Sequence, residues 1–129
     1  MASMIKPQGG FSMPKRKSVK SLPYLTWIHE LPCVITRQFG VQAAHLSFTN
    51  RAFGHYGRGR QTKAGDRWVL PLSPRLHDEQ HDGSERDFWA RYGINPHLAC
   101  VILWGVFSEV GNDGLEEARA IIQAGDFRL

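Results

Sequence analysis

Residues 43–81 read AAHLSFTNRAFGHYGRGRQTKAGDRWVLPLSPRLHDEQH, and they hold most of the chemical information in this sequence. His45 ends a short extended run, residues 68–72 form a second one, and a helix start with His77 and His81 follows. Histidines four positions apart lie one above the other on a helix face, so they can hold one metal ion together. With a third histidine on the preceding strand, this order suggests metal-assisted cleavage of a phosphodiester.

A glycine-rich loop over residues 47–67 connects the two extended runs. Loops of about 20 residues within compact domains are usually functional. Basic side chains in and after this loop favour contact with phosphate groups, and solvated surface charge is the alternative interpretation of them. The predicted nucleic-acid contacts are Arg51, Arg58, Arg60, Lys63 and Arg75.

The 129 residues correspond to one domain, and their charge is divided unevenly along the chain. Residues 1–75 carry twelve Lys or Arg against two acids, a net charge of +10. Residues 76–129 carry four Arg against ten acids, a net charge of −6. A basic half of this kind attracts a polyanion, so we expect DNA as the partner, including single-stranded or branched forms.

The sequence predicts neither membrane insertion nor secretion. No uninterrupted apolar run approaches the length of about 18 residues that a membrane span requires. The N-terminal segment lacks the apolar centre of a signal peptide, and the two cysteines are too few for a disulfide framework. We therefore expect a reducing, cytoplasmic environment.

The predicted fold class is α+β. Residues 1–22 are expected to form a flexible basic arm, and residues 23–129 the folded domain. β-forming side chains predict strand-like pieces in residues 24–28 and 33–36, with a returning strand over residues 41–46. Ser or Asn caps with nearby Pro, and Gly after the helix ends, predict the helices. These helices cover residues 74–81, 85–92, 96–110 and 115–123.

The stretch from Cys33 to about Phe107 resembles the HNH, or ββα-metal, nucleases. In chain order, the matching features are AAHL at 43–46, KAGDRW at 63–68, VLPL at 69–72, HDEQH at 77–81 and FWARYGINP at 88–96. Within that superfamily, the chain is similar to the small phage and prophage HNH-like proteins that include the Ref-type recombination-associated nucleases. The resemblance implies a ββα-metal core over residues 33–92, with a helical extension over residues 95–123.

The resemblance also implies a role for each candidate site residue. His45 corresponds to the general base that deprotonates the attacking water, and an ordinary imidazole can do this near neutral pH. His77 and His81 correspond to the residues that hold a divalent ion, Mg²⁺, Mn²⁺ or Zn²⁺, which stabilises charge on the scissile phosphate. Asp66 would orient a histidine or complete the metal site. The implied activity is that of a metal-dependent DNA endonuclease in phage or prophage DNA processing or recombination.

Three positions depart from the family pattern. Cys33 is the one remaining member of a four-cysteine zinc knuckle, so we expect no structural zinc and an aromatic core in its place. Ala44 and Leu76 stand where relatives often carry metal-binding side chains. Water could complete the metal site, His45 itself could bind the metal, or catalysis could have been lost. The aromatic residues expected in the core are Trp27, Phe39, Trp68, Phe88 and Trp89.

Two other functions are compatible with these departures. One is a catalytically decayed HNH scaffold that binds nucleic acid, and the other is a small interaction protein whose basic arm docks on an acidic partner. We interpret His97 as structural, His55 as a surface loop side chain and Cys100 as part of the apolar core. The C-terminal helices could form a dimer face. The apolar face expected for the helix over residues 96–110 consists of Leu98, Val101, Ile102, Gly105 and Val106.

Overall fold

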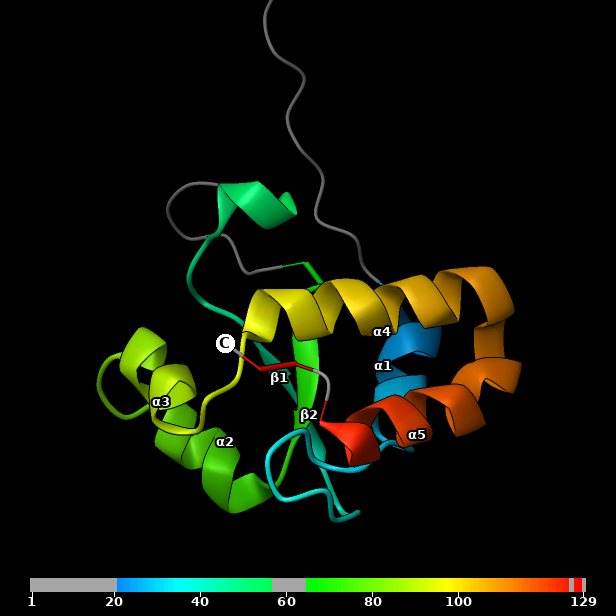
Figure 1. The fold of residues 1–129 in the computed structure, drawn as a ribbon, viewed down its shortest axis with the longest axis horizontal. Coiled ribbons are helices and arrows are strands. Elements are labelled where there is room, and N and C mark those ends of the chain that lie inside the picture. Colours follow the sequence, from blue (N-terminus) through cyan, green and yellow to red (C-terminus); the bar gives the residue numbers. More distant parts are fainter. Residues whose placement is uncertain (1–20, 57–64, 126, 129) are drawn as a thin grey trace, which may run out of the picture.

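The computed structural model describes residues 21–56, 65–125 and 127–128, in which helices surround a small antiparallel sheet (Figure 1). This mixed content confirms the predicted α+β class. The elements, in chain order, are α1 (Leu22–Ile28), β1 (Gln42–His45), the 3-10 helix η2 (Arg51–Phe53), β2 (Val69–Leu72), α2 (Pro74–Gln80), α3 (Glu85–Arg91), α4 (Pro96–Val110), the 3-10 helix η3 (Gly111–Gly114) and α5 (Leu115–Ala124).

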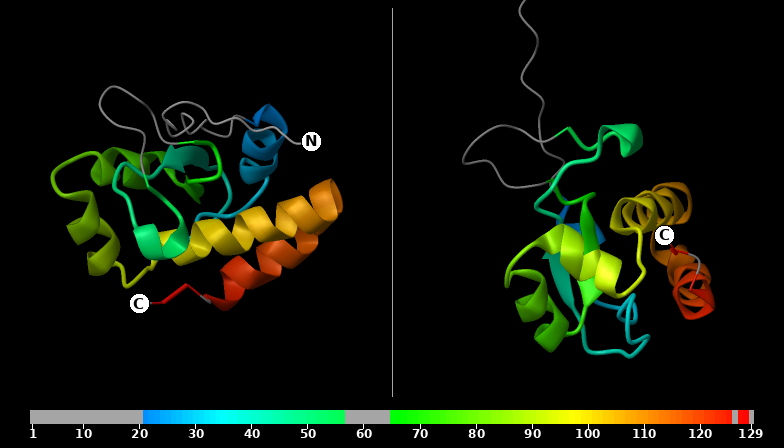
Figure 2. Two further views of the ribbon diagram at one scale, coloured as in Figure 1. Left: turned by 90° about the horizontal axis from the view of Figure 1, so that it is seen from above. Right: turned by 60° about the vertical axis from the view of Figure 1, so that its left-hand side comes forward.

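Strands β1 and β2 pair antiparallel, with Gln42 opposite Leu72 and His45 opposite Val69. One residue, Ser73, separates β2 from α2, and α2 packs against β1, whereas α4 packs against β2. Figure 1 shows α2 and α3 on one side of the strands, and Figure 2 shows α4 and α5 lying side by side on the other. Every residue of β2 is buried as a result.

Side-chain caps begin three of the helices at the predicted positions. Ser73, Ser84 and Asn95 each accept a hydrogen bond from a backbone N–H three residues later, which satisfies a free donor of the helix start. Pro74 and Pro96 follow two of these caps, where a missing N–H costs nothing. The helices predicted after residue 73 are therefore confirmed, to within one residue at each end.

Residues 24–28 belong to helix α1, so the strand predicted there is wrong. Ser21 caps this helix by accepting a hydrogen bond from the backbone N–H of Tyr24 at 3.2 Å. Ser21 and Leu22 thus belong to the fold, and the rest of the predicted arm lies outside the described residues. The predicted piece at 33–36 is also wrong, because it forms a turn. The buried face of α1, at helical spacing, consists of Tyr24, Trp27 and Ile28.

Cys33 organises the turn that follows α1. Its thiol sulfur accepts weak hydrogen bonds from the backbone N–H groups of Ile35 and Thr36, both at 3.4 Å. The backbone N–H of Arg37 donates to the Cys33 carbonyl at 2.8 Å, and Arg37 has a φ of 64°. A left-handed residue of this kind closes a tight turn. The thiol itself is free and buried, so it serves this turn as a hydrogen-bond acceptor.

Most of the expected core is present, with one aromatic exception. Phe39 is 61% exposed, and its ring lies 5.6 Å from the guanidinium carbon of Arg119. The other four aromatic residues expected in the core are buried, and so is Cys100. The predicted face of α4 is correct only in part: Ile102 and Val106 pack against the core, whereas Val101 is exposed. This helix is apolar on most sides, so its sequence does not indicate which side packs. Its buried residues are Pro96, His97, Ala99, Cys100 and Leu103.

The stretch Pro96–Ala124 is long and apolar enough to cross a membrane, judged by length and composition alone. It is not one straight helix, because α4 ends at Val110, the next residue Gly111 has a φ of 70°, and α5 turns back beside α4 (Figure 1). The 15 residues of α4 extend about 22 Å at 1.5 Å per residue, less than the hydrocarbon core of about 30 Å. Neither helix alone reaches the length of a membrane span.

Packing of α2 can be tested with two leucines in contrasting environments. Leu76 on α2 is fully buried, whereas Leu22 at the start of α1 is 74% exposed. We expect Leu76→Ala to lower the free energy of unfolding by about 2–5 kcal/mol, because it leaves a cavity between α2 and the core. Leu22→Ala should change it by less than about 0.5 kcal/mol. Urea unfolding followed by tryptophan fluorescence measures both, and equal losses would contradict this packing of α2.

Candidate active site

His45 and Asp66 are in direct contact at the end of β1. His45 Nε2 lies 2.9 Å from Asp66 Oδ1, and the two side chains are 40% and 16% exposed. Because a carboxylate oxygen accepts, Nε2 carries the hydrogen and donates it. Nδ1 is then the basic nitrogen of the neutral ring. The structure thus brings the two predicted catalytic residues together, in an arrangement that suits Asp66 to orient His45.

Asp66 also contacts the start of α1. Its Oδ2 accepts a hydrogen bond from the backbone N–H of Ser21 at 2.7 Å. Backbone pairing continues past β1 and β2, because the N–H of Leu46 donates to the carbonyl of Trp68 at 2.8 Å. The N–H of Trp68 in turn donates to the carbonyl of Gly65 at 3.0 Å, which forms a turn. This turn carries Asp66 back towards the end of β1.

His77 and His81 lie side by side at the end of α2. Their ring centroids are 4.9 Å apart. His77 Nδ1 lies 2.8 Å from Gln42 Oε1, and an amide oxygen accepts, so Nδ1 donates and Nε2 keeps its lone pair. Partial burial lowers the pKa of His77, and the nearby charge of His81 lowers it further. A neutral imidazole is the form that binds metal ions.

The pair on α2 could supply two nitrogen ligands to a divalent ion. Among the residues that the structure describes, no three His, Cys, Asp or Glu side chains are grouped so that they could hold a metal ion. In the described part of the chain, His45 is therefore not grouped with the pair. Ala44 and Leu76 are fully buried and apolar. An ion held by the pair would complete its coordination with water or with substrate oxygens.

Side chains of helix α2 form hydrogen bonds with both ends of β1. The side chain of His77 contacts Gln42 at the first residue of the strand. Gln80 Nε2 donates to the backbone carbonyl of His45 at 3.1 Å, at the last residue of the strand. The charge of His45 also contributes to the lowered pKa of His77, so the two rings are within electrostatic reach. The histidine pair and His45 therefore belong to one strand–helix unit.

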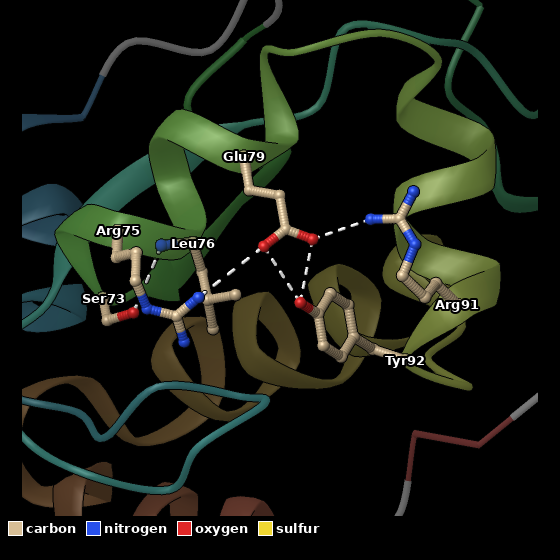
Figure 3. Close-up of polar contacts among 6 residues, drawn as sticks. All are labelled: Ser73, Arg75, Leu76, Glu79, Arg91 and Tyr92. Atoms are coloured by element: carbon tan, nitrogen blue, oxygen red, sulfur yellow. Dashed lines mark hydrogen bonds and ion pairs between the residues drawn. The ribbon is translucent and has the colours of Figure 1, made fainter.

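The predicted nucleic-acid contacts fall only partly within the described residues. Arg51 is exposed, and its guanidinium carbon lies 5.4 Å from the ring centroid of Tyr56. Arg75 is 74% exposed and lies 3.7 Å from Glu79 Oε1 (Figure 3). Surface ion pairs of this kind are weak, so Arg75 remains able to contact a phosphate. Outside the described residues lie Arg58, Arg60 and Lys63.

His55 is buried, so its interpretation as a surface loop side chain is wrong. Its Nδ1 lies 3.0 Å from His97 Nε2, and its ring stacks on Trp68 with a centroid distance of 4.5 Å. His97 Nε2 also lies 3.1 Å from the carbonyl of Phe48. Because a carbonyl accepts, His97 Nε2 carries the hydrogen and His55 Nδ1 is an acceptor. The structural interpretation of His97 is therefore confirmed.

Two polar residues beside the site were missed by the sequence analysis. Gln80 is 1% exposed and follows the buried Leu76 by four residues, so it lies on the inner face of α2. That spacing was a usable signal, because a polar residue on a buried face needs hydrogen-bond partners. Glu85, in the first turn of α3, accepts a hydrogen bond from Gln80 at 2.9 Å. Its position after a cap residue gave no sign of this contact.

Comparison with known proteins gives one family and one relative. The family described as "Protein of unknown function (DUF968)" matches residues 5–108. The chain is also similar to the "Uncharacterized protein YdfU" of Escherichia coli (strain K12), with 30% identity over 92 residues. That alignment covers 71% of this chain and 24% of YdfU, so the chain spans about a quarter of its relative's length. No solved structure matches the chain.

The buried histidine pair makes the stability of the fold depend on pH. Desolvation lowers the pKa of His55 from 6.5 to about 4, with smaller contributions from His97 and Arg67. The unfolded chain therefore takes up a proton at higher pH than the folded chain does. The stabilising contribution of neutral His55 is complete above the unfolded pKa and is lost as the pH falls towards 4. The loss amounts to as much as about 3 kcal/mol.

Guanidinium unfolding across this pH range measures the loss. His55→Phe keeps an aromatic ring on Trp68 without a titrating group, so its stability should fall less steeply than that of the wild type. His29→Gln changes an exposed histidine and should retain the wild-type slope. Parallel curves for the wild type and His55→Phe would show that the buried pair does not govern acid stability.

Proposed function

This chain belongs to the DUF968 family, and we propose that it is a metal-dependent DNA endonuclease of the HNH type. The observation that carries the proposal is the contact between His45 and Asp66 at the end of β1, beside the helix with His77 and His81. The order of strand, loop, strand and helix supports it as well. This is the order of the ββα-metal nucleases that the sequence resembles.

His45 would act on the attacking water. Asp66 accepts the hydrogen of His45 Nε2, which leaves Nδ1 able to take a proton. The water oxygen bonds to phosphorus as its proton passes to Nδ1, and the bond from phosphorus to the leaving oxygen breaks. Asp66 then stabilises the imidazolium that forms, as the buried carboxylate of a catalytic triad does. General-base catalysis of this kind contributes about 10²–10⁴-fold in rate.

His77 and His81 would hold the divalent ion, which we expect to be Mg²⁺, Mn²⁺ or Zn²⁺. Such an ion, when bound, stabilises the negative charge on the scissile phosphate and on the leaving oxygen. Gln42 holds the His77 ring through Nδ1, so Nε2 is the nitrogen available for binding. Hydrogen bonds from a ligand histidine to a neighbouring acceptor fix its orientation in this way.

The charge distribution supports DNA as the substrate, including single-stranded or branched forms. Two segments rich in Lys and Arg, residues 1–20 and 57–64, join the described fold at Ser21 and Gly65. Both junctions lie beside Asp66, one through a hydrogen bond and the other as its chain neighbour. Long-range attraction between these charges and phosphates would concentrate DNA at the site. We assign the activity to phage or prophage DNA processing or recombination in the cytoplasm.

A catalytically decayed scaffold that binds nucleic acid is the second candidate. Ala44 and Leu76 favour it, because both are fully buried and apolar at positions where HNH enzymes often carry metal ligands. A site with only the pair on α2 would then bind metal weakly. Such a protein would bind DNA with an affinity that falls as salt rises, and it would leave the DNA intact.

Plasmid nicking tests the nuclease proposal directly. The wild type is expected to nick supercoiled plasmid with at least one of Mg²⁺, Mn²⁺ and Zn²⁺. His45→Ala should lower the rate by about 10²–10⁴-fold, because it removes the general base. His29→Ala, at an exposed histidine after α1, is the matched control and should cut at the wild-type rate.

Two results would reject the nuclease: equal cutting by His45→Ala, or no cutting by the wild type with any of the three ions. In the second case, the dependence of DNA binding on salt decides what remains. Binding that weakens with rising salt would favour the scaffold. Salt-independent binding would leave the basic residues without their proposed role, and an acidic protein partner would then be the better candidate.

Calorimetric metal titration distinguishes the predicted metal ligands from the predicted general base. His77→Ala should weaken the binding of Mn²⁺ or Zn²⁺ by more than about tenfold, since even changes outside the ligand shell cost 10–100-fold. His45→Ala should keep the wild-type affinity, because His45 is not grouped with the pair on α2. Equal losses of affinity in the two variants would make His45 a ligand rather than the base.

A further inference from the structure

Glu85 accepts hydrogen bonds from three segments of the chain. Its Oε1 accepts from the backbone N–H of Ser47 at 2.9 Å and also from the Ser47 hydroxyl. Its Oε2 accepts from Gln80 Nε2 and from Trp89 Nε1, both at 2.9 Å. Both carboxylate oxygens are engaged twice. Hydrogen bonds to a charged acceptor are short and strong, so this carboxylate holds its partners in fixed relative positions.

Two of these partners belong to the framework of the candidate active site. Ser47 follows His45 by two residues, and Gln80 lies on α2 between the two metal-binding histidines. Gln80 Nε2 also donates to the backbone carbonyl of His45 at 3.1 Å. Because both partners of Nε2 can only accept, the orientation of the amide is determined. Glu85 therefore connects the strand that presents His45 to the helix that presents the histidine pair.

We propose that Glu85 is a positioning residue, which sets the distance between His45 and the histidine pair on α2. The inference rests on the proposed nuclease function and adds a requirement to it: a residue of α3, outside the strand–helix unit, controls the geometry of the reaction. A general base must stand within hydrogen-bond reach of the water that it deprotonates. A displacement of about 1 Å can lower a rate by about 100-fold.

A second carboxylate connects the same two helices without contacting β1. Glu79 Oε2 accepts a hydrogen bond from Arg91 at 2.7 Å, and the Tyr92 hydroxyl lies 3.0 and 2.8 Å from the two Glu79 oxygens. Figure 3 shows Glu79 directed from α2 towards these two residues, with Arg75 on its other side. Its partners in the described part of the chain all belong to α2, α3 or the residue that ends α3. A substitution of Glu79 therefore weakens the packing of α2 on α3 without removing a contact to the strand that carries His45.

The test compares Glu85→Gln with Glu79→Gln in the full chain. Each change keeps the size of the side chain and replaces an acceptor oxygen by a donating amide. We expect Glu85→Gln to lower kcat for plasmid nicking by about tenfold to a hundredfold. KM and metal affinity should stay near the wild-type values, because the pair on α2 is intact. Glu79→Gln should keep the wild-type kcat, and Tm measures the loss of stability in both.

A second readout is independent of cleavage. The ¹⁵N NMR signals of the His45 ring report which nitrogen carries the hydrogen and how the ring is hydrogen-bonded. Glu85→Gln should shift these signals, whereas Glu79→Gln should leave them in place. Ser47→Ala removes only the hydroxyl partner of Glu85 and should shift them in the same direction. This milder variant keeps the test available if Glu85→Gln does not fold.

Equal losses of kcat in the two glutamine variants, at equal losses of Tm, would overturn the positioning role. Unchanged His45 signals in Glu85→Gln and Ser47→Ala would also overturn it. If the wild type does not cut DNA, the nuclease proposal fails by itself. The His45 signals then decide alone whether Glu85 controls the placement of this ring.

Discussion

The antiparallel pairing of β1 with β2 positions the candidate catalytic residues and the helix that carries the histidine pair. With His45 opposite Val69, Ala44 is fully buried and His45 is partly exposed. Side chains alternate between the two faces of a strand, so a slip of one residue would bury His45 and expose Ala44. The same pairing brings Asp66 back to His45 and lets α2 begin beside the strand. The geometry of the candidate site therefore depends on backbone hydrogen bonds between the strands, in which no catalytic side chain takes part.

Much of the fold could be predicted, because local signals determine it. Caps such as Ser73 and Asn95 fix where a helix begins, whatever the helix packs against. Helix α1 is the exception: Ser21 and a proline in the first turn mark its start, but its side chains favour a strand. Tyr24 packs edge-on against Trp104 at 4.7 Å, and Trp27 lies 5.3 Å from Phe107. These contacts with α4 select the helix, and no local pattern indicates them.

The histidines of the candidate site and Asp66 could be predicted from the sequence, whereas the contacts of Glu85 and of His55 could not. The spacing of His77 and His81 is visible in the sequence, because one helix carries both. Glu85 contacts a residue 38 positions away, and the partner of His55 is 42 positions away. Only the folded chain brings such pairs together. Buried polar groups need hydrogen-bond partners, so Glu85 and His55 each have defined partners in the folded chain.

The hydrogen bond from the Ser21 N–H to Asp66 makes the candidate site depend on an intact peptide bond between residues 20 and 21. It uses an amide hydrogen that exists only while residue 20 remains attached. A protease that cut this peptide bond would leave a free amino group in place of the amide, and such a group is largely protonated at neutral pH. The new cation would compete with His45 for the same carboxylate. Proteolysis at this one peptide bond would thus change the electrostatics of the candidate site, while Ser21 and Asp66 remain in the same chain.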